Sequence, residues 1–142
     1  MSTLIGGLVR RFYSDVWNQR SERAAREILH RDFQFRGSLD AERTGPDGFI
    51  DYMHMVHDAL GNYTCDLVEL VEAGDRAVGR LDFHGIHRAT FFGVPATGKL
   101  IRWAGAAFFR QRDEQIGALW VLGDIDAVKK QLGVAAAASF ES

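Results

Sequence analysis

The sequence predicts one α+β domain in which three helices pack on a curved, mainly antiparallel sheet and a short helix follows. Three observations predict this class. Apolar residues recur with helical spacing in the first part of the chain, and from Tyr63 onward the spacing becomes that of strands. At 142 residues, with 46% apolar and 25% charged residues, the chain has the composition of a single compact domain. We expect this domain to span residues 1–133 and residues 134–142 to form a loosely ordered tail.

The first predicted helix carries an apolar stripe along one face. Its members recur at i, i+3, i+4 and i+7, and they are Ile5, Leu8, Val9, Phe12, Tyr13, Val16 and Trp17. A second helix should follow Asn18 and Gln19, with Ser21 as its N-cap. A third, near residues 47–60, should end at Gly61 because glycine readily terminates helices.

Extended segments follow these helices. Residues 33–35 predict a short half-buried strand, and residues 37–46 predict a polar loop. Four longer strands are then expected in succession, at residues 63–73, 76–90, 99–112 and 115–123, and they imply an antiparallel meander. A last helix should begin at Asp124 and end at Gly133.

The last predicted strand is apolar on both faces. One face would carry Ile116, Ala118, Trp120 and Leu122, and the other Gly117, Leu119 and Val121. A single layer of helices covers only one face of a sheet. We therefore expect the uncovered face to meet a second copy of the chain in a homodimer, unless further structure of this chain covers it.

Composition and charge exclude several classes of partner. The formal net charge of −2 provides no positive field for nucleic acid or for an anionic membrane surface. No apolar run approaches the roughly 20 residues of a membrane span, and the first residues do not read as a signal peptide, so a cytoplasmic protein is expected. Cys65 is the only cysteine, which excludes an internal disulfide and a thiolate-rich metal site, and no metal site is predicted.

Three segments carry a resemblance to a known family. They are Gly85-Ile86-His87, then residues 92–99 with their Pro-x-Thr-Gly-Lys turn, then Trp120-x-x-x-Asp124 followed by Gln131-Leu132-Gly133. In this order they resemble the SnoaL-like polyketide cyclases, also called ester cyclases, of the nuclear transport factor 2-like superfamily. The predicted order of helices and strands agrees with that family from about residue 5 to residue 133.

The resemblance implies a cone-shaped α+β barrel with a deep pocket between sheet and helices, usually in a homodimer. It also implies intramolecular aldol cyclisation of a hydrophobic, carbonyl-rich, polyketide-like substrate without a metal or an organic cofactor. Asp124 matches the carboxylate that takes a proton from an acidic carbon, and His87 matches the histidine that helps to hold the enolate.

Asp124 has a second interpretation, because an aspartate that precedes a helix is also a common N-cap. An enzyme requires Asp124 inside the pocket with a raised pKa, as a general base for a carbon acid does. A non-catalytic module for hydrophobic ligands or for assembly would instead show Asp124 capping the helix and facing water.

Arg80, Asp82 and His84 suggest a third hypothesis. Arg-x-Asp resembles the motif of limonene-epoxide hydrolases, so an epoxide hydrolase or a dehydratase would need Arg80, Asp82 and a histidine to converge on one water. The second carboxylate of that motif is replaced here by Leu122, which favours a structural ion pair between Arg80 and Asp82. Strand alternation places His84 and His87 on opposite faces, so only one of them can face the pocket.

The remaining candidates for the pocket are mainly aromatic. A flat ligand would be bound by large apolar side chains, and His54 is a candidate for the rim. His54 and His57 have the spacing of a zinc pair but no predicted third ligand. The aromatic candidates are Tyr13, Trp17, Phe35, Phe83, Trp103 and Trp120.

Overall fold

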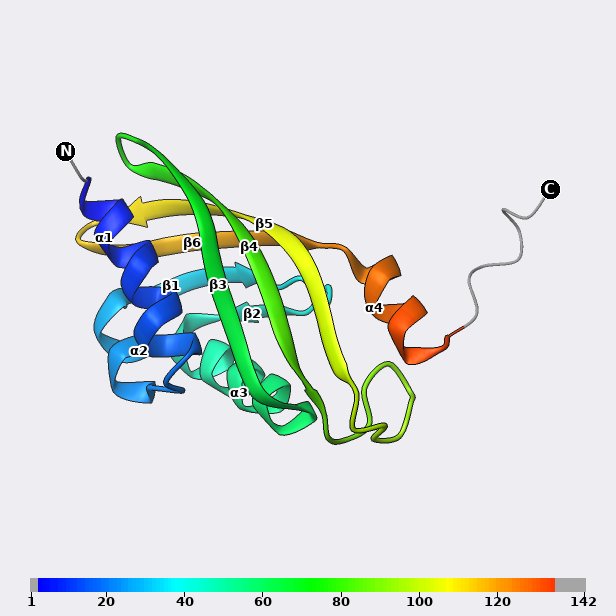
Figure 1. The fold of residues 1–142 in the computed structure, drawn as a ribbon. Helices are drawn as coiled ribbons and strands as arrows, with labels where there is room; N and C mark the ends of the chain where they lie inside the picture. The colour runs from blue at the N-terminus through cyan, green and yellow to red at the C-terminus, as the bar shows by residue number, and fades with distance from the viewer. Residues whose placement is uncertain (1–2, 135–142) are drawn as a thin grey trace.

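The computed structural model describes residues 3–134, and all but the first residue of the tail predicted at 134–142 lies outside the described residues. A six-stranded, strongly curved sheet has the strand order β2 (Glu42–Thr44), β1 (Leu29–Arg36), β6 (Gln115–Gly123), β5 (Leu100–Arg112), β4 (Arg76–His87) and β3 (Leu60–Ala73). Helices gather on one side of this sheet, and the last helix lies beyond the far end of β6 (Figure 1). The predicted α+β class, with a curved and mainly antiparallel sheet, is confirmed.

The helical elements form largely where the apolar spacing predicts them. The first predicted helix is α1, which continues as a wider π-helix, η1, in which the Asn18 N–H donates to the Tyr13 carbonyl at 3.0 Å. The Ser21 side chain caps α2 and accepts a hydrogen bond from the Ala24 N–H at 3.1 Å, as expected. The helices are α1 (Leu4–Arg11), η1 (Phe12–Trp17), α2 (Glu22–Ile28), α3 (Gly45–Ala59) and α4 (Ile125–Leu132).

The strands extend the predicted pattern in two places. The predicted short strand is longer and starts directly after α2, and the predicted loop at 37–46 contains the short strand β2. Consecutive strands β3 to β6 form the predicted antiparallel meander, and β1 adds to β6 in parallel. The strands are β1 (Leu29–Arg36), β2 (Glu42–Thr44), β3 (Leu60–Ala73), β4 (Arg76–His87), β5 (Leu100–Arg112) and β6 (Gln115–Gly123).

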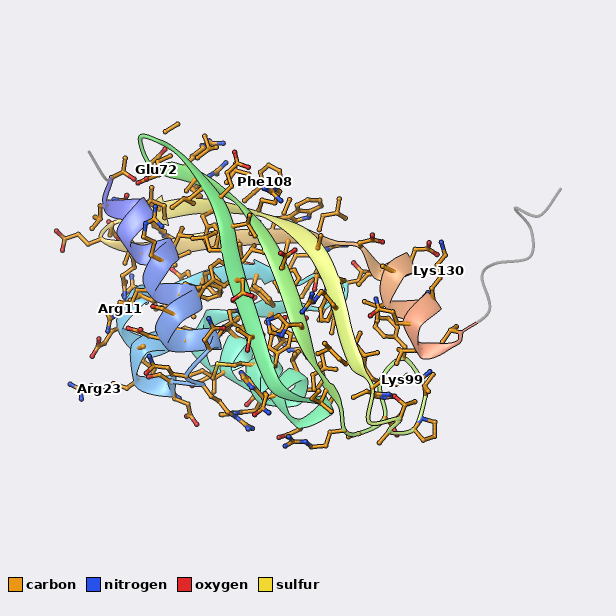
Figure 2. The ribbon with its side chains drawn as sticks, in the orientation of Figure 1. Arg11, Arg23, Glu72, Lys99, Phe108 and Lys130 are labelled. Carbon is orange, nitrogen blue, oxygen red and sulfur yellow. The ribbon has the colours of Figure 1, made fainter. Side chains whose placement is uncertain are left out.

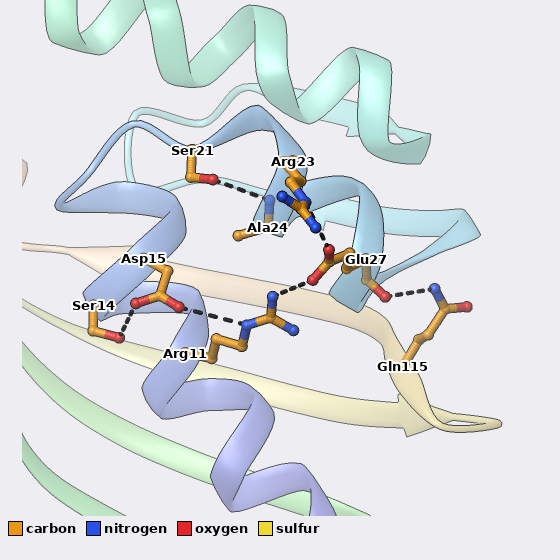
Figure 3. Close-up of polar contacts among 8 residues, drawn as sticks. All are labelled: Arg11, Ser14, Asp15, Ser21, Arg23, Ala24, Glu27 and Gln115. Carbon is orange, nitrogen blue, oxygen red and sulfur yellow. Dashed lines mark hydrogen bonds and ion pairs between the residues drawn. The ribbon is translucent and has the colours of Figure 1, made fainter.

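Polar contacts join the first two helices to the start of β6 (Figure 3). The Arg11 guanidinium pairs with the Glu27 carboxylate, and Arg23 pairs with the same carboxylate at 3.2 Å. The Gln115 side-chain amide donates to the Glu27 carbonyl at 3.1 Å. Because these groups are largely exposed, they orient the helices more than they stabilise them.

The core lies between the helices and the face of the sheet that we call the inner face. On β4 and β5 this face carries residues such as Leu81, Phe83, Trp103 and Phe109, all buried. From the helices, Phe12 and Trp17 pack with Phe49 of α3 at ring-centroid distances of 5.2 and 5.3 Å. None of the described helices is both long enough and apolar enough to cross a membrane.

Candidate functional site

An aromatic cavity lies between the inner face of the sheet and the helices. Its volume is about 20 Å³, enough for about one water molecule. The deep pocket implied by the resemblance is therefore nearly filled by side chains of this chain. The lining comes from η1, α3, the segment after β1 and five strands, and consists of Tyr13, Trp17, Phe35, Ser38, Leu39, Tyr52, Val56, Tyr63, Phe83, Trp103, Leu119 and Val121.

Three aromatic rings from adjacent strands stack along one wall of the cavity. Tyr63 of β3 stacks on Trp103 of β5 at 6.0 Å between ring centroids, and Phe83 of β4 lies 5.2 Å from Trp103. Strand pairing sets this arrangement, because Phe83 and Trp103 lie opposite each other in the ladder of β4 and β5. The indole ring of Trp103 therefore packs against both of these rings.

The cavity lining contains no charged side chain. Burial raises the pKa of the Tyr13 and Tyr63 hydroxyls well above its usual value, so both stay protonated at neutral pH. The indole Nε1 of Trp103 is the one buried side-chain nitrogen or oxygen without a hydrogen-bond partner among the described residues. The cavity thus offers an apolar surface with neutral hydrogen-bonding groups.

Leu39 and Val56 separate the cavity from an outer groove, because both residues line each of these spaces. The groove is open and has a volume of about 650 Å³. Besides those two residues, α3 and the segment after β4 form it through Asp51, His54, Met55, Asp58, Ala59, Ala89, Thr90, Phe91 and Phe92. A ligand in the groove would lie directly outside the aromatic cavity.

Asp124 directly follows β6 and caps α4. Its Oδ1 accepts a hydrogen bond from the Ala127 N–H at 3.1 Å, and the side chain is exposed to solvent. The preceding residue, Gly123, lies against the cavity wall: a Cβ placed on it would be 3.1 Å from Trp103 Nε1 and 2.7 Å from the Ser38 Cβ. Asp124 itself lies outside the cavity in this conformation.

His87 lies on the inner face, as strand alternation with Leu81 and Phe83 requires, and it is fully buried. Its ring holds the loop that follows β4: Nδ1 accepts from the Thr97 N–H at 3.2 Å, and Nε2 donates to the Val94 carbonyl at 3.1 Å. The ring does not line the cavity. The predicted contact with an enolate is replaced here by an anchor for this loop.

The structure places the other polar candidates away from the cavity. Arg80, Asp82 and His84 lie on the outer face of β4, because they alternate with the buried inner residues. Arg80 pairs with Glu69 at 3.3 Å instead of with Asp82, and His84 contacts Asp66 at 3.1 Å. The convergence on one water that an epoxide hydrolase or a dehydratase requires is absent from this arrangement.

Trp120 and His54 also take other positions. Trp120 is 46% exposed on the outer face of the sheet, where the Arg36 guanidinium lies 5.0 Å from the centre of its ring. His54 lines the outer groove, as a residue at the rim would, and contacts Glu22 and Arg20. The described residues contain no cluster of three or more His, Cys, Asp or Glu side chains that is placed to hold a metal ion.

Of the aromatic candidates, Tyr13, Trp17, Phe35, Phe83 and Trp103 line the cavity. The sequence analysis missed Tyr52 and Tyr63 as lining residues. Tyr63 shares an inward face with Cys65, so strand alternation would have identified it. Ser38 and Leu39 carry no such signal, since their place depends on how the segment between β1 and β2 folds back.

Comparison with known proteins identifies the family. Residues 7–132 match the model of the SnoaL-like polyketide cyclases. The chain belongs to this family. No curated protein matches the sequence.

Solved structures share the fold of this SnoaL-like domain. TsrD from Streptomyces laurentii superposes with a TM-score of 0.82 at 23% identity, over 93% of this chain and 96% of TsrD. A protein from Acidithiobacillus ferrooxidans, provisionally assigned as a polyketide cyclase, gives 0.81 at 21% identity, over 96% and 99% of the two chains. IdmH from Streptomyces antibioticus, with the same provisional assignment, gives 0.78 at 22% identity, over 90% and 97%. At these identities the likeness shows the fold alone.

Proposed function

We propose that this SnoaL-like domain binds a small hydrophobic ligand that contains a carbonyl group and catalyses cofactor-free cyclisation or isomerisation of it. The observation that carries the proposal is the aromatic cavity without a charged lining residue, two of whose lining residues, Ser38 and Trp103, lie against Gly123, the residue before Asp124. Such a cavity favours flat, neutral and apolar ligands. Membership of the cyclase family supports a carbonyl substrate.

In this mechanism Asp124 is the general base, and the bound ligand extends beyond the cavity to the exposed side chain of Asp124. Its Oδ1 is held by the N-terminus of α4, and Oδ2 takes a proton from a carbon next to a ligand carbonyl. The electron pair of the broken C–H bond forms the enolate, which attacks a second carbonyl of the same ligand in an aldol step. The resulting alkoxide takes up the proton from the Asp124 carboxyl group, which restores the carboxylate, and these steps use neither a metal nor an organic cofactor.

His87 has an indirect part in this proposal. Its two ring nitrogens bind the loop that carries Phe91 and Phe92, and both of these residues line the outer groove. We assign His87 as a positioning residue that shapes the groove through this loop.

Hydrogen–deuterium exchange at an acidic carbon tests the assignment of Asp124. The probe is 2-tetralone, a bicyclic ketone whose C1 protons are acidified by the carbonyl and the ring. Asp124→Asn should reduce the protein-dependent exchange rate in deuterated water by about 10²-fold or more, because an amide cannot take the proton. The rate is measured by NMR with the uncatalysed exchange subtracted.

The matched control separates the base from the cap. Asn still accepts the N-terminal N–H of α4, so the melting temperature of Asp124→Asn should stay near that of the wild type, whereas Asp124→Ala should lose about 1 kcal/mol of stability. Equal exchange by the wild type and Asp124→Asn, with 2-tetralone shown to bind, would refute the assignment of the base.

A binding or assembly module without catalysis is the second candidate. The specific observation in its favour is that Asp124 is exposed and caps α4, as the sequence analysis requires of such a module. Binding of 2-tetralone with no protein-dependent exchange at all would favour this candidate over the cyclase.

We also infer that the chain forms a homodimer through the outer face of the sheet. The register aligns Val71, Val78, Phe108 and Trp120 in one row across β3 to β6, and all four side chains are exposed. Phe108 lies on the side of the sheet away from α2 and α3 (Figure 2). An exposed apolar row of this kind is typical of an interface, and a stable dimer should bury at least about 1,000 Å² in total.

A further inference from the structure

We propose that the indole N–H of Trp103 is the donor that binds the ligand's carbonyl oxygen, and that the ligand class is a planar bicyclic ketone. The assignment deepens the proposed function and rests on it for the location of the ligand. It concerns binding alone, so it is measured without turnover.

The indole N–H of Trp103 is buried and lacks an acceptor. The side chain is 3% exposed, and Nε1 has no hydrogen-bond partner among the described residues. A buried donor without an acceptor is destabilising, because folding removes its hydrogen bond to water and returns nothing. The site therefore favours any molecule that places an acceptor oxygen at this nitrogen.

Neighbouring aromatic rings hold the Trp103 indole in place. Tyr63 and Phe83 lie at 6.0 and 5.2 Å from the Trp103 ring, so the direction of the N–H bond is fixed before a ligand arrives. A fixed donor loses little conformational freedom on binding, which favours affinity.

Gly123 packs closely on the indole nitrogen. A Cβ on Gly123 would be 3.1 Å from Nε1 and 2.7 Å from the Ser38 Cβ, so a larger residue here would press on the indole ring. The Asp124 N–H donates to the Ala104 carbonyl at 2.9 Å, so the backbone of the proposed base is paired with the residue that follows Trp103.

The chemistry of the lining selects the ligand class. The Tyr13 and Tyr63 hydroxyls stay protonated, and no lining residue is charged, so neither a cationic nor an anionic ligand gains a counter-ion. The stacked rings of Tyr63, Phe83 and Trp103 present flat apolar surfaces. A planar ring system that places one carbonyl oxygen at Trp103 matches both features.

The ligand must enlarge the cavity to enter, since the space of about 20 Å³ holds only about one water. Leu39 and Val56 are the residues shared with the outer groove. Leu39 lies in the segment between β1 and β2, outside any helix or strand, so its displacement is the smallest change that would join the two spaces.

The test compares 2-tetralone with tetralin, which has the same ring system but no carbonyl. The chain contains Trp17, Trp103 and Trp120, so a ¹⁵N-labelled protein should give three indole N–H signals. 2-Tetralone should move the Trp103 signal downfield, as a new hydrogen bond does, whereas tetralin should not. Trp103→Phe should weaken 2-tetralone binding by about 5-fold and leave tetralin binding nearly unchanged.

Three results would overturn the assignment: equal 2-tetralone affinity of the wild type and Trp103→Phe, an unchanged Trp103 signal at saturation, or no 2-tetralone binding up to its solubility limit. If Trp103→Phe does not fold, the signals are assigned from Trp17→Phe and Trp120→Phe, and the wild-type shifts decide alone. A downfield shift of the Trp103 signal combined with unchanged exchange in Asp124→Asn would support Trp103 as the donor and refute Asp124 as the base. An unshifted Trp103 signal combined with reduced exchange in Asp124→Asn would support Asp124 as the base and refute Trp103 as the donor.

Discussion

The two faces of the sheet have similar composition but different environments. On β6, Leu119 and Val121 point to the inner face and are 3% and 5% exposed, whereas Trp120 and Leu122 point outward and are 46% and 54% exposed. Helices of this chain cover the inner face, and no described element covers the outer row. Residue type alone therefore does not determine which face of a two-sided apolar strand is buried within the chain.

We assign different roles to the two faces of the sheet. The inner face combines rings from the strands with rings from η1 and α3, and the small space between them is the proposed ligand site. The outer face presents a continuous apolar row, which we assign to a second subunit. The following predictions test this division, from the largest expected effect to the smallest.

A matched pair of leucine substitutions on β6 gives the largest contrast in stability. Leu119→Ala should lower the free energy of unfolding by about 2–5 kcal/mol, because it removes buried atoms from a packed core. Leu122→Ala should lower the free energy of monomer unfolding by less than about 1 kcal/mol. Urea denaturation at two protein concentrations separates unfolding from subunit dissociation. Equal losses at low concentration would contradict the division of the two faces.

A charge on the outer row should dissociate the dimer. Phe108→Glu should weaken self-association by at least about 10-fold, because the interface would bury an unpaired carboxylate. Sedimentation velocity over a concentration series measures the effect. Met55→Glu is the control, since Met55 is similarly exposed but lies on α3, and its association should match that of the wild type. A monomeric wild type at micromolar concentration would reject the dimer.

A smaller effect concerns the helices that cover the inner face. His57 of α3 donates from Nε2 to the Trp17 carbonyl at 2.8 Å, and its ring stacks on Trp17. Burial is the main cause that lowers the pKa of His57 below 6.5, and the charges of Arg20 and His54 lower it further. The hydrogen bond to the Trp17 carbonyl and the charge of Asp58 act in the opposite direction and raise this pKa in part. The unfolded chain therefore binds the proton more readily, so stability should fall as the pH drops through about 6.5.

The matched variant for this pH effect is His57→Gln, which keeps a side-chain N–H donor but does not titrate in this range. Thermal unfolding of both proteins between pH 7.5 and 5 should show a steeper loss for the wild type. An identical pH dependence would show that His57 does not contribute.

The sequence predicts much of the fold, because the apolar periods are clear. The stripe from Ile5 to Trp17 and the alternation in β4 and β6 give the correct helices and the antiparallel meander. The short strand β2 was missed, since Glu42 to Thr44 has no apolar alternation and forms only through its pairing with β1. The parallel pairing of β1 with β6 depends on contacts between distant segments, which local periods do not report.

The site was predicted less completely. Strand alternation placed His84 and His87 on opposite faces correctly, but it could not show that the His87 ring would bind the loop at Val94 and Thr97. Trp120 was assigned to the pocket, although alternation with the buried Leu119 and Val121 puts it on the other face. The missing information was which face the helices cover, and only the packing of the whole chain provides it.

The most direct test of the account is a crystal structure of the protein with 2-tetralone bound. We expect the ligand ring to lie against the wall formed by Tyr63, Phe83 and Trp103, with its carbonyl oxygen within about 3 Å of Trp103 Nε1 and Leu39 displaced toward the outer groove. A ligand found only in the outer groove or on the row around Phe108, with the aromatic cavity unchanged, would contradict it.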